Sequence, residues 1–228
     1  MTRTRTINLM EPILKANDAV ATRLRHQWAR TGTLAINLMS APGAGKTTLL
    51  EATLSTLYPQ YRVLVLEGDI ETERDAERIR RLGVPAHQIT TGGTCHLEAQ
   101  MITAALEALK TDTIGDFLFI ENVGNLVCPA SYDLGEHLRV VLLSVPEGDD
   151  KPKKYPKAFR TASVFVITKI DLLPHFDFDL DRVRNEALDL NPDLHIFALS
   201  PKTGEGMTPW IDFLRQTHHH LTTTIRSP

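Results

Sequence analysis

The chain has 228 residues, 42% of them hydrophobic, and its 25 basic and 28 acidic side chains leave a formal net charge of −3. This length suits one α/β domain, the lack of a basic excess argues against nucleic-acid binding, and no stretch approaches the roughly 20 apolar residues of a membrane span. Because the basic N-terminus lacks the apolar core of a secretory signal and two cysteines are too few for a disulfide scaffold, we expect a cytoplasmic protein.

Helical and strand-like apolar patterns alternate along the chain. An amphipathic helix or helix pair is expected over residues 7–30, with Asn17-Asp18 as a candidate break, and further helices over 46–58, 71–82, 95–109, 179–190 and 207–217. Apolar strands are expected over 34–39, 61–66, 117–121, 140–145, 164–168 and 194–199, and a short extended piece near 88–90. This alternation indicates an α/β fold with a mostly parallel central sheet and helices on both faces. An N-terminal helical extension is expected at 1–32 and the main domain at 33–228.

A glycine-rich turn separates the first strand from the helix that follows it. The turn reads Ser40-Ala41-Pro42-Gly43-Ala44-Gly45-Lys46-Thr47 and departs from the strict phosphate-loop pattern only in having Ser40 for glycine. Backbone N–H groups there would cradle phosphates, Lys46 would reach the β and γ oxygens, and Thr47 would bind Mg²⁺. The alternative is a chance glycine-rich turn. The predicted phosphate contacts are Gly43, Ala44, Gly45, Lys46, Thr47 and Thr48.

Two later strand ends carry residues suited to guanine recognition. Thr168-Lys169-Ile170-Asp171 resembles the Asn-Lys-x-Asp motif of GTPases, and the Asp171 carboxylate can accept both the ring N–H and the exocyclic amine of guanine. The stem of Lys169 would lie along the base. The second segment, Ser200-Pro201-Lys202, resembles the Ser-Ala-Lys loop that contacts the guanine carbonyl. Each segment alone could be an ordinary turn, but together they follow successive strands at the sheet edge where α/β proteins bind ligands.

Acidic residues at two other strand ends are candidates for Mg²⁺ and for the attacking water. Asp69 follows the second strand, and Glu121 opens Glu121-Asn122-Val123-Gly124, where GTPases carry an acidic residue and a glycine that senses the γ-phosphate. Asp75 is a further magnesium candidate, although the charged run 71–78 also reads as a solvated helix. The predicted catalytic residues are therefore Lys46, Asp69, Glu121 and Gly124.

Cys95, His96 and Cys128 form a candidate metal site. Thiolate and imidazole are ligands for Ni²⁺ as well as for Zn²⁺, so the residues do not choose the metal. The alternative is that both cysteines are small buried hydrophobes. If Cys95 and His96 lie on a helix, they face different directions and one ion could not bind both within one subunit, unless a helix N-terminus or a dimer changes the geometry.

Two remaining polar runs have simpler interpretations. The basic segment Lys151–Lys157 is expected to be a solvated loop, with the alternative that one lysine reaches nucleotide or a second subunit as a clamp on phosphate charge. The run His218-His219-His220 is expected to be a polar helix end. The other histidines are scattered, and we interpret them as surface or core residues: His26, His87, His137, His175 and His195.

With these motifs identified, most of the chain resembles the HypB family, the GTPases that serve nickel insertion during maturation of [NiFe]-hydrogenase. The most specific matches are Gly93-Thr94-Cys95-His96-Leu97-Glu98 and Glu121-Asn122-Val123-Gly124-Asn125-Leu126-Val127-Cys128-Pro129-Ala130. The related UreG GTPases of urease maturation are expected to carry Cys-Pro-His where this chain has Cys95-His96. The cysteine-rich and histidine-rich N-terminal tracts of some members are missing here, so storage of many nickel ions is not expected.

The resemblance implies a P-loop fold of the SIMIBI class and slow hydrolysis of GTP to GDP with Mg²⁺ as cofactor. It further implies GTP-dependent homodimers in which Cys95, His96 and Cys128 meet their twins and bind Ni²⁺. The implied partners are a HypA-like metallochaperone and the precursor of the hydrogenase large subunit. The segment around Leu9, Met10, Ile13 and Leu14 is a candidate docking surface, unless that helix packs on its own domain. The alternatives are an accessory GTPase for another metalloenzyme such as urease, or a metal carrier in which hydrolysis is incidental.

Overall fold

A parallel sheet of seven strands forms the centre of the molecule. The computed structural model describes residues 10–58, 60–69, 74–110 and 115–226, and within them the strand order is β3-β2-β4-β1-β5-β6-β7. All neighbouring strands run parallel. The strands are β1 (Leu34–Met39), β2 (Val63–Asp69), β3 (Ala86–Thr90), β4 (Phe117–Glu121), β5 (Leu138–Ser144), β6 (Val164–Thr168) and β7 (His195–Ala198).

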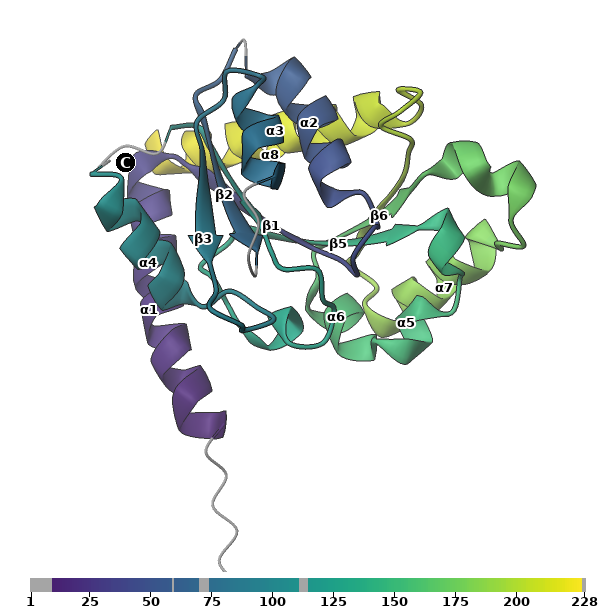
Figure 1. The fold of residues 1–228 in the computed structure, drawn as a ribbon, viewed down its shortest axis with the longest axis horizontal. Coiled ribbons are helices and arrows are strands. Elements are labelled where there is room, and N and C mark those ends of the chain that lie inside the picture. Colours follow the sequence, from purple (N-terminus) through teal and green to yellow (C-terminus); the bar gives the residue numbers. More distant parts are fainter. Residues whose placement is uncertain (1–9, 59, 70–73, 111–114, 227–228) are drawn as a thin grey trace, which may run out of the picture.

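Helices cover both faces of this sheet (Figure 1). On one face lie α2 (Lys46–Leu57), α3 (Arg74–Arg80) and α8 (Met207–Arg226); on the other lie α1 (Met10–Thr31), α4 (Ala99–Ala108), α6 (Pro156–Thr161) and α7 (Leu180–Leu190), with the short α5 (Lys151–Lys154) beside α7. Each face has its own apolar core, and the second face divides into a part under α1 and α4 and a part under α6 and α7. Among the described helices, none is long and apolar enough to cross a membrane.

The strand order places the ends of several strands around one crevice. β1 is central, with β4 on one side and β5 on the other, so successive connections leave the sheet in opposite directions at the carboxyl end of β1. Such a switch point is where open α/β sheets bind ligands. The phosphate loop follows β1 there, and Asp69 and Glu121 end β2 and β4.

The predicted α/β fold is confirmed, but four predicted features of the helices are wrong. Helix α1 runs unbroken through Asn17-Asp18, because the Asn17 side chain is buried and bonds distant backbone groups instead of its own helix. Helix α4 begins at Ala99, so Cys95 and His96 precede it in a loop. The segment 151–161 forms two short helices instead of a solvated loop, and α8 continues past His218–His220 to Arg226.

Candidate nucleotide and metal sites

The loop between β1 and α2 has the backbone conformation that a phosphate loop requires. Gly43 and Gly45 have φ angles of +80° and +92°, which L-residues with side chains rarely adopt, and Gly45 is the N-cap of α2. Lys46 is 8% exposed, and its Nζ donates a hydrogen bond of 3.1 Å to the Oγ of Ser40. The serine that departs from the strict motif therefore holds the lysine inside the loop.

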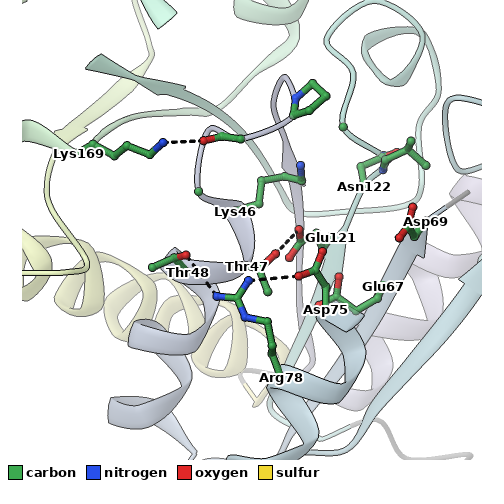
Figure 2. A pocket seen from close by; sticks show the side chains of 16 residues that line it. Lys46, Thr47, Thr48, Glu67, Asp69, Asp75, Arg78, Glu121, Asn122 and Lys169 are labelled. Carbon is green, nitrogen blue, oxygen red and sulfur yellow. Dashed lines mark hydrogen bonds and ion pairs between the residues drawn. The ribbon is translucent and has the colours of Figure 1, made fainter. Parts of the chain in front are cut away.

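A cleft of about 510 Å³ opens between this loop and the ends of β2 and β4. It brings together residues that the sequence predicted separately, including Lys46, Thr47, Asp69, Asp75, Glu121 and Gly124. In Figure 2, the carboxyl groups of Glu67, Asp75 and Glu121 gather beside Thr47. The arrangement brings the phosphate loop and several acidic side chains together in one cleft.

Thr47 and Glu121 are the best placed of these residues to hold a divalent cation. The Thr47 hydroxyl donates a hydrogen bond of 2.9 Å to Oε1 of Glu121, whose Oε2 is buried without a hydrogen-bond partner among the described residues. A hydroxyl and a carboxylate oxygen are the hard ligands that Mg²⁺ prefers. Asp75 instead accepts a bond of 3.2 Å from Arg78, which also binds Glu51 at 2.6 Å, so it is already held by an arginine at the side of the cleft.

Glu67 lies beside Glu121 on the neighbouring strand and was not predicted as a site residue. The two are register partners on β2 and β4, and they are 2% and 5% exposed. Burial and the neighbouring Glu121 raise the pKa of Glu67 well above its usual range. Burial also raises the pKa of Glu121 to about 7, although Lys46 and Thr47 oppose that shift. Burial side by side therefore disfavours having both carboxyl groups ionised at once.

A second cavity of about 200 Å³ adjoins the cleft, and Gly45, Thr48 and Lys169 line both. The two predicted base-recognition segments meet there, since its wall also contains Asp171, Ser200, Pro201 and Lys202. The Thr168 hydroxyl donates a bond of 2.6 Å to the carbonyl of Ala44, and Lys169 Nζ donates one of 2.7 Å to the carbonyl of Gly43. Threonine at the usual asparagine position thus fastens this segment to the phosphate loop.

Cys95, His96 and Cys128 come together in one subunit. One sulfur or nitrogen atom from each lies within 4.8 Å of the others, and all three side chains are half-buried. Because Cys95 and His96 precede α4 in a loop, the objection that neighbouring helical residues diverge does not apply. The His96 ring stacks on Tyr132 with centroids 3.9 Å apart. Neither ring nitrogen has a hydrogen bond to the described residues, although Glu98 Oε1 lies 3.5 Å from Nε2.

The hydrogen bond with Cys95 and partial burial raise the pKa of the Cys128 thiol. This thiol is therefore neutral near pH 7, and a bound metal would displace its proton. Two close thiols and an imidazole with free nitrogens are a donor set that fits a borderline or soft metal ion.

Asn122, which the sequence analysis did not single out, connects the two sites. It lines the nucleotide cleft next to Glu121. Its Oδ1 accepts a bond of 3.2 Å from the backbone N–H of Leu97, and its Nδ2 donates one of 3.2 Å to Asn37. Asn125 adds a weaker contact, from its Nδ2 to the carbonyl of Cys95 at 3.4 Å. A wall of the nucleotide cleft is therefore bonded to the loop that carries Cys95 and His96.

The basic segment and the histidine run lie away from both cavities. Lys153 pairs with Glu186 at 2.7 Å, Lys154 pairs with Asp150 at 2.5 Å, and Lys157 donates to Ser131 at 2.7 Å. His218 lies inside α8, half-buried against the rings of Tyr61 and Phe117, and burial lowers its pKa. It is a packing residue there and not a polar helix end.

Comparison with known proteins agrees with these features. The nucleotide-binding domain model of the CobW/HypB/UreG family matches residues 34–198. The chain is 47% identical over 214 residues to the hydrogenase maturation factor HypB of Escherichia coli K12, covering 94% of this chain and 73% of that protein. It is 44% identical over 211 residues to the hydrogenase/urease maturation factor HypB of Helicobacter pylori 26695, covering 91% and 86%.

Solved structures give the same relationship. A crystal structure of HypB from Helicobacter pylori in complex with nickel superimposes with a TM-score of 0.85 at 44% identity, covering 90% of this chain and 96% of that one. HypB from Archaeoglobus fulgidus gives 0.83 at 41% identity, covering 90% and 100%. The signal recognition particle receptor FtsY of Elizabethkingia anophelis gives 0.51 at 14% identity over 86% and 68%, a likeness of fold alone that agrees with a SIMIBI-class P-loop NTPase. The chain therefore belongs to the CobW/HypB/UreG family and, within it, to the HypB maturation factors.

Proposed function

We propose that this protein is a GTP-hydrolysing metallochaperone that couples GTP-dependent dimerisation to nickel binding and delivery during [NiFe]-hydrogenase maturation. The observation that carries the proposal is the bonded connection between the two sites. Glu121 lies in the nucleotide cleft, Cys128 lies in the metal cluster, and Asn122 between them holds the loop of Cys95 and His96. A change at the γ-phosphate can therefore move metal ligands through a short, continuous segment.

In this proposal residues 33–228 form the GTPase domain and residues 1–32 its helical extension. Asp171 and the Ser200–Lys202 loop select guanine in the smaller cavity. Lys46 and the N–H groups of the phosphate loop stabilise negative charge on the β and γ phosphates. Thr47 and Glu121 would hold Mg²⁺, with Asp69 in the same cleft, and the bound ion would supply positive charge to offset the negative charge that develops as the γ-phosphoryl group is transferred to water. Asp75 pairs with Arg78 and is not among the magnesium ligands of this proposal.

Gly124 is suited to sense the γ-phosphate because its backbone approaches the phosphate loop closely. A Cβ atom at this position would lie 3.1 Å from Pro42 Cγ, a tighter approach than most side-chain contacts. Any movement of the phosphate loop on binding GTP is then passed directly to residues 121–128. Slow turnover sets how long the GTP-bound arrangement lasts.

A second copy of the chain completes the metal site in this proposal. The triad supplies three ligand atoms, and a closed four-coordinate site needs one more. Val127, beside Cys128, is 60% exposed, the largest exposure among the large hydrophobic residues described. An apolar residue of this kind next to half-buried ligands suits a face that closes against its twin. The nickel complex of the Helicobacter pylori relative supports Ni²⁺ as the ion, and Zn²⁺ suits the same ligands.

The client enzyme is proposed from the relatives. The Escherichia coli protein is a hydrogenase maturation factor, so we infer a hydrogenase large-subunit precursor as client, with a HypA-like metallochaperone as partner in the cytoplasm. The Helicobacter relatives are named hydrogenase/urease maturation factors, which favours urease as a second client. A lysine of the segment 151–157 reaching nucleotide across the dimer also remains a proposal.

Size-exclusion chromatography with metal analysis tests the coupled function. The full chain is loaded with Ni²⁺ under reducing conditions and run without nucleotide, with GDP, with a non-hydrolysable GTP analogue and with the matching ATP analogue. We expect a dimer with altered nickel content only with the GTP analogue. If the oligomeric state and the nickel content are the same with every nucleotide, the proposed coupling is wrong. An equal response to the ATP analogue would contradict selection of guanine.

A variant pair separates the metal assignment from the rest. Cys128→Ala is expected to lose most nickel binding, because it removes one of the two thiols, while still binding GTP. Ser131→Ala, three residues further along the same loop, is the matched control and should bind nickel like the wild type. Full nickel affinity in Cys128→Ala would reject the triad as the site.

A further inference from the structure

A buried asparagine in α1 touches both chain segments that carry the proposed metal ligands. Asn17 is 3% exposed. Its Oδ1 accepts a bond of 2.9 Å from the backbone N–H of Ala99, and its Nδ2 donates one of 2.8 Å to the backbone carbonyl of Asp133. Both polar atoms of the amide are used, and their partners fix which atom faces which segment. One side chain thus bridges segments far apart in the sequence.

The first of these bonds anchors the segment of Cys95 and His96. Ala99 is the first residue of α4 and follows His96 closely, so its N–H is one that no earlier turn of the helix can satisfy. The N-cap residue, Glu98, makes no side-chain capping bond. Asn17 therefore caps α4 from another helix and fixes where the preceding loop ends.

The second bond anchors the segment of Cys128. Asp133 follows Tyr132, whose ring stacks on His96, and its carboxylate accepts two bonds of 2.7 and 2.8 Å from Arg25 of α1. The chain next to it approaches α1 so closely that a Cβ on Gly135 would lie 2.6 Å from the carbonyl of Ala21. This loop is therefore tied to α1 along two turns of the helix.

We propose that Asn17 is a positioning residue of the metal site, which holds the Cys95–His96 loop and the Cys128 loop at the separation that one ion needs. The inference rests on the proposed function of Cys95, His96 and Cys128 as metal ligands. Helix α1 then helps to hold the metal-binding loops in place and is more than an N-terminal extension. Groups that hold ligands in place typically change metal affinity by about 10- to 100-fold when they are removed.

Nickel titration of full-length variants under reducing conditions tests this role. Affinity is measured by competition with a chromophoric chelator, and the thiolate-to-nickel charge-transfer absorption reports ligand geometry. Asn17→Ala removes both bonds and is expected to weaken Ni²⁺ binding about tenfold or more and to change the absorption. Asn17→Asp keeps the acceptor for Ala99, and thus the cap of α4, but loses the donor to Asp133, so it should fold and still bind nickel less tightly.

Val20→Ala is the matched control, because Val20 is buried on the same helix one turn later and packs in the same core. It should lower the melting temperature but leave nickel affinity and absorption within about twofold of wild type. All variants should bind GTP normally. The inference is overturned if both Asn17 variants keep the wild-type affinity and spectrum, or if Val20→Ala weakens nickel binding as much as Asn17→Ala. If Cys128→Ala bound nickel like the wild type, the assignment of Cys95, His96 and Cys128 as the metal ligands would be wrong, and the proposed function would fail for that separate reason.

Discussion

The paired carboxyl groups of Glu67 and Glu121 dominate the electrostatics of the nucleotide cleft. Both are almost fully buried, and Lys46 acts on each of them with an opposing positive charge. Without a cation, a pair of this kind keeps a proton that carboxyl groups in water lose near pH 4.5. Binding of Mg²⁺ at Glu121 would expel that proton, so magnesium affinity should rise with pH.

Glu121→Gln should remove the pH dependence of stability that this carboxyl imposes on the nucleotide-free protein. A carboxyl whose pKa is about 7 when folded and 4.5 when unfolded favours folding below pH 4.5, and this contribution is lost as pH rises through 7. Glutamine cannot lose a proton, so the variant should gain about 2–3 kcal/mol over wild type between pH 4.5 and pH 8. Urea unfolding across this range, with a chelator present, measures the difference.

The exposed Glu107→Gln on α4 serves as the control and should show no such trend. Parallel pH profiles for wild type and Glu121→Gln would show that Glu121 is ionised in the folded protein well below pH 7.

Among the single residues of the two sites, those in motifs could be predicted from the sequence, whereas the residues that support them could not. Lys46, Thr47 and Asp171 stand at spacings that their chemistry requires, and the fold brings them to neighbouring cavities. Glu67 matters only because β2 and β4 are register partners, a pairing that separates the residues by a long stretch of sequence. Asn17 likewise gains its role from bonds to Ala99 and Asp133, which no local pattern reveals.

Among the elements, α1 is the one whose role the sequence left most open. Its inner side contributes Trp28, which is fully buried, together with Val20, Ala21 and Leu24, to a core shared with α4 and β4. Its outer side exposes Ile13, 47% accessible, while Leu9 lies outside the described residues. Packing on its own domain is therefore the main role of the helix, and docking at Ile13 stays a prediction.

Trp28→Ala should destabilise the whole protein, because α1 shares its core with the sheet. Loss of a fully buried tryptophan typically costs about 3–5 kcal/mol. Ile13→Ala, on the exposed side of the same helix, should change stability by no more than about 0.5 kcal/mol. Denaturant unfolding followed by both tryptophan-independent circular dichroism and nucleotide release should give one coincident transition. A separate early transition for α1, or a cost below about 1 kcal/mol for Trp28→Ala, would mean that the helix is an independent extension.

Strands were easier to predict than helix ends in this chain. The buried strand 117–121 is apolar at each of its first four positions, and this signal is visible without knowledge of the neighbouring strands. The sequence predicts an earlier start for α4 because Cys95 continues the apolar spacing of Ala99 and Ile102. In the structure the backbone N–H of Leu97 donates to Asn122 instead, and the helix begins at Ala99. The short helices α5 and α6 contain prolines and lysines that in the sequence alone resemble a loop, and both helices contact α7.

In the whole molecule, one edge of the sheet carries the nucleotide cleft, and a single segment from Glu121 to Cys128 leads from it to the metal cluster. The phosphate loop contacts this segment at Gly124, and the segment holds the opposite metal loop through Asn122. Two ligands that act on one segment must influence each other's affinity equally, since coupling free energy is reciprocal. The affinity for the metal is therefore expected to differ between the two nucleotide states.

The most direct test is the dissociation constant of Ni²⁺ measured with saturating GDP and with a saturating non-hydrolysable GTP analogue. We predict that the two constants differ by about fivefold or more in the wild type, and that Asn122→Ala, which cuts the bond to Leu97, reduces the difference. The affinity for the GTP analogue relative to GDP should change by the same factor when nickel is added. Equal nickel affinities in the two nucleotide states of the wild type would contradict the account.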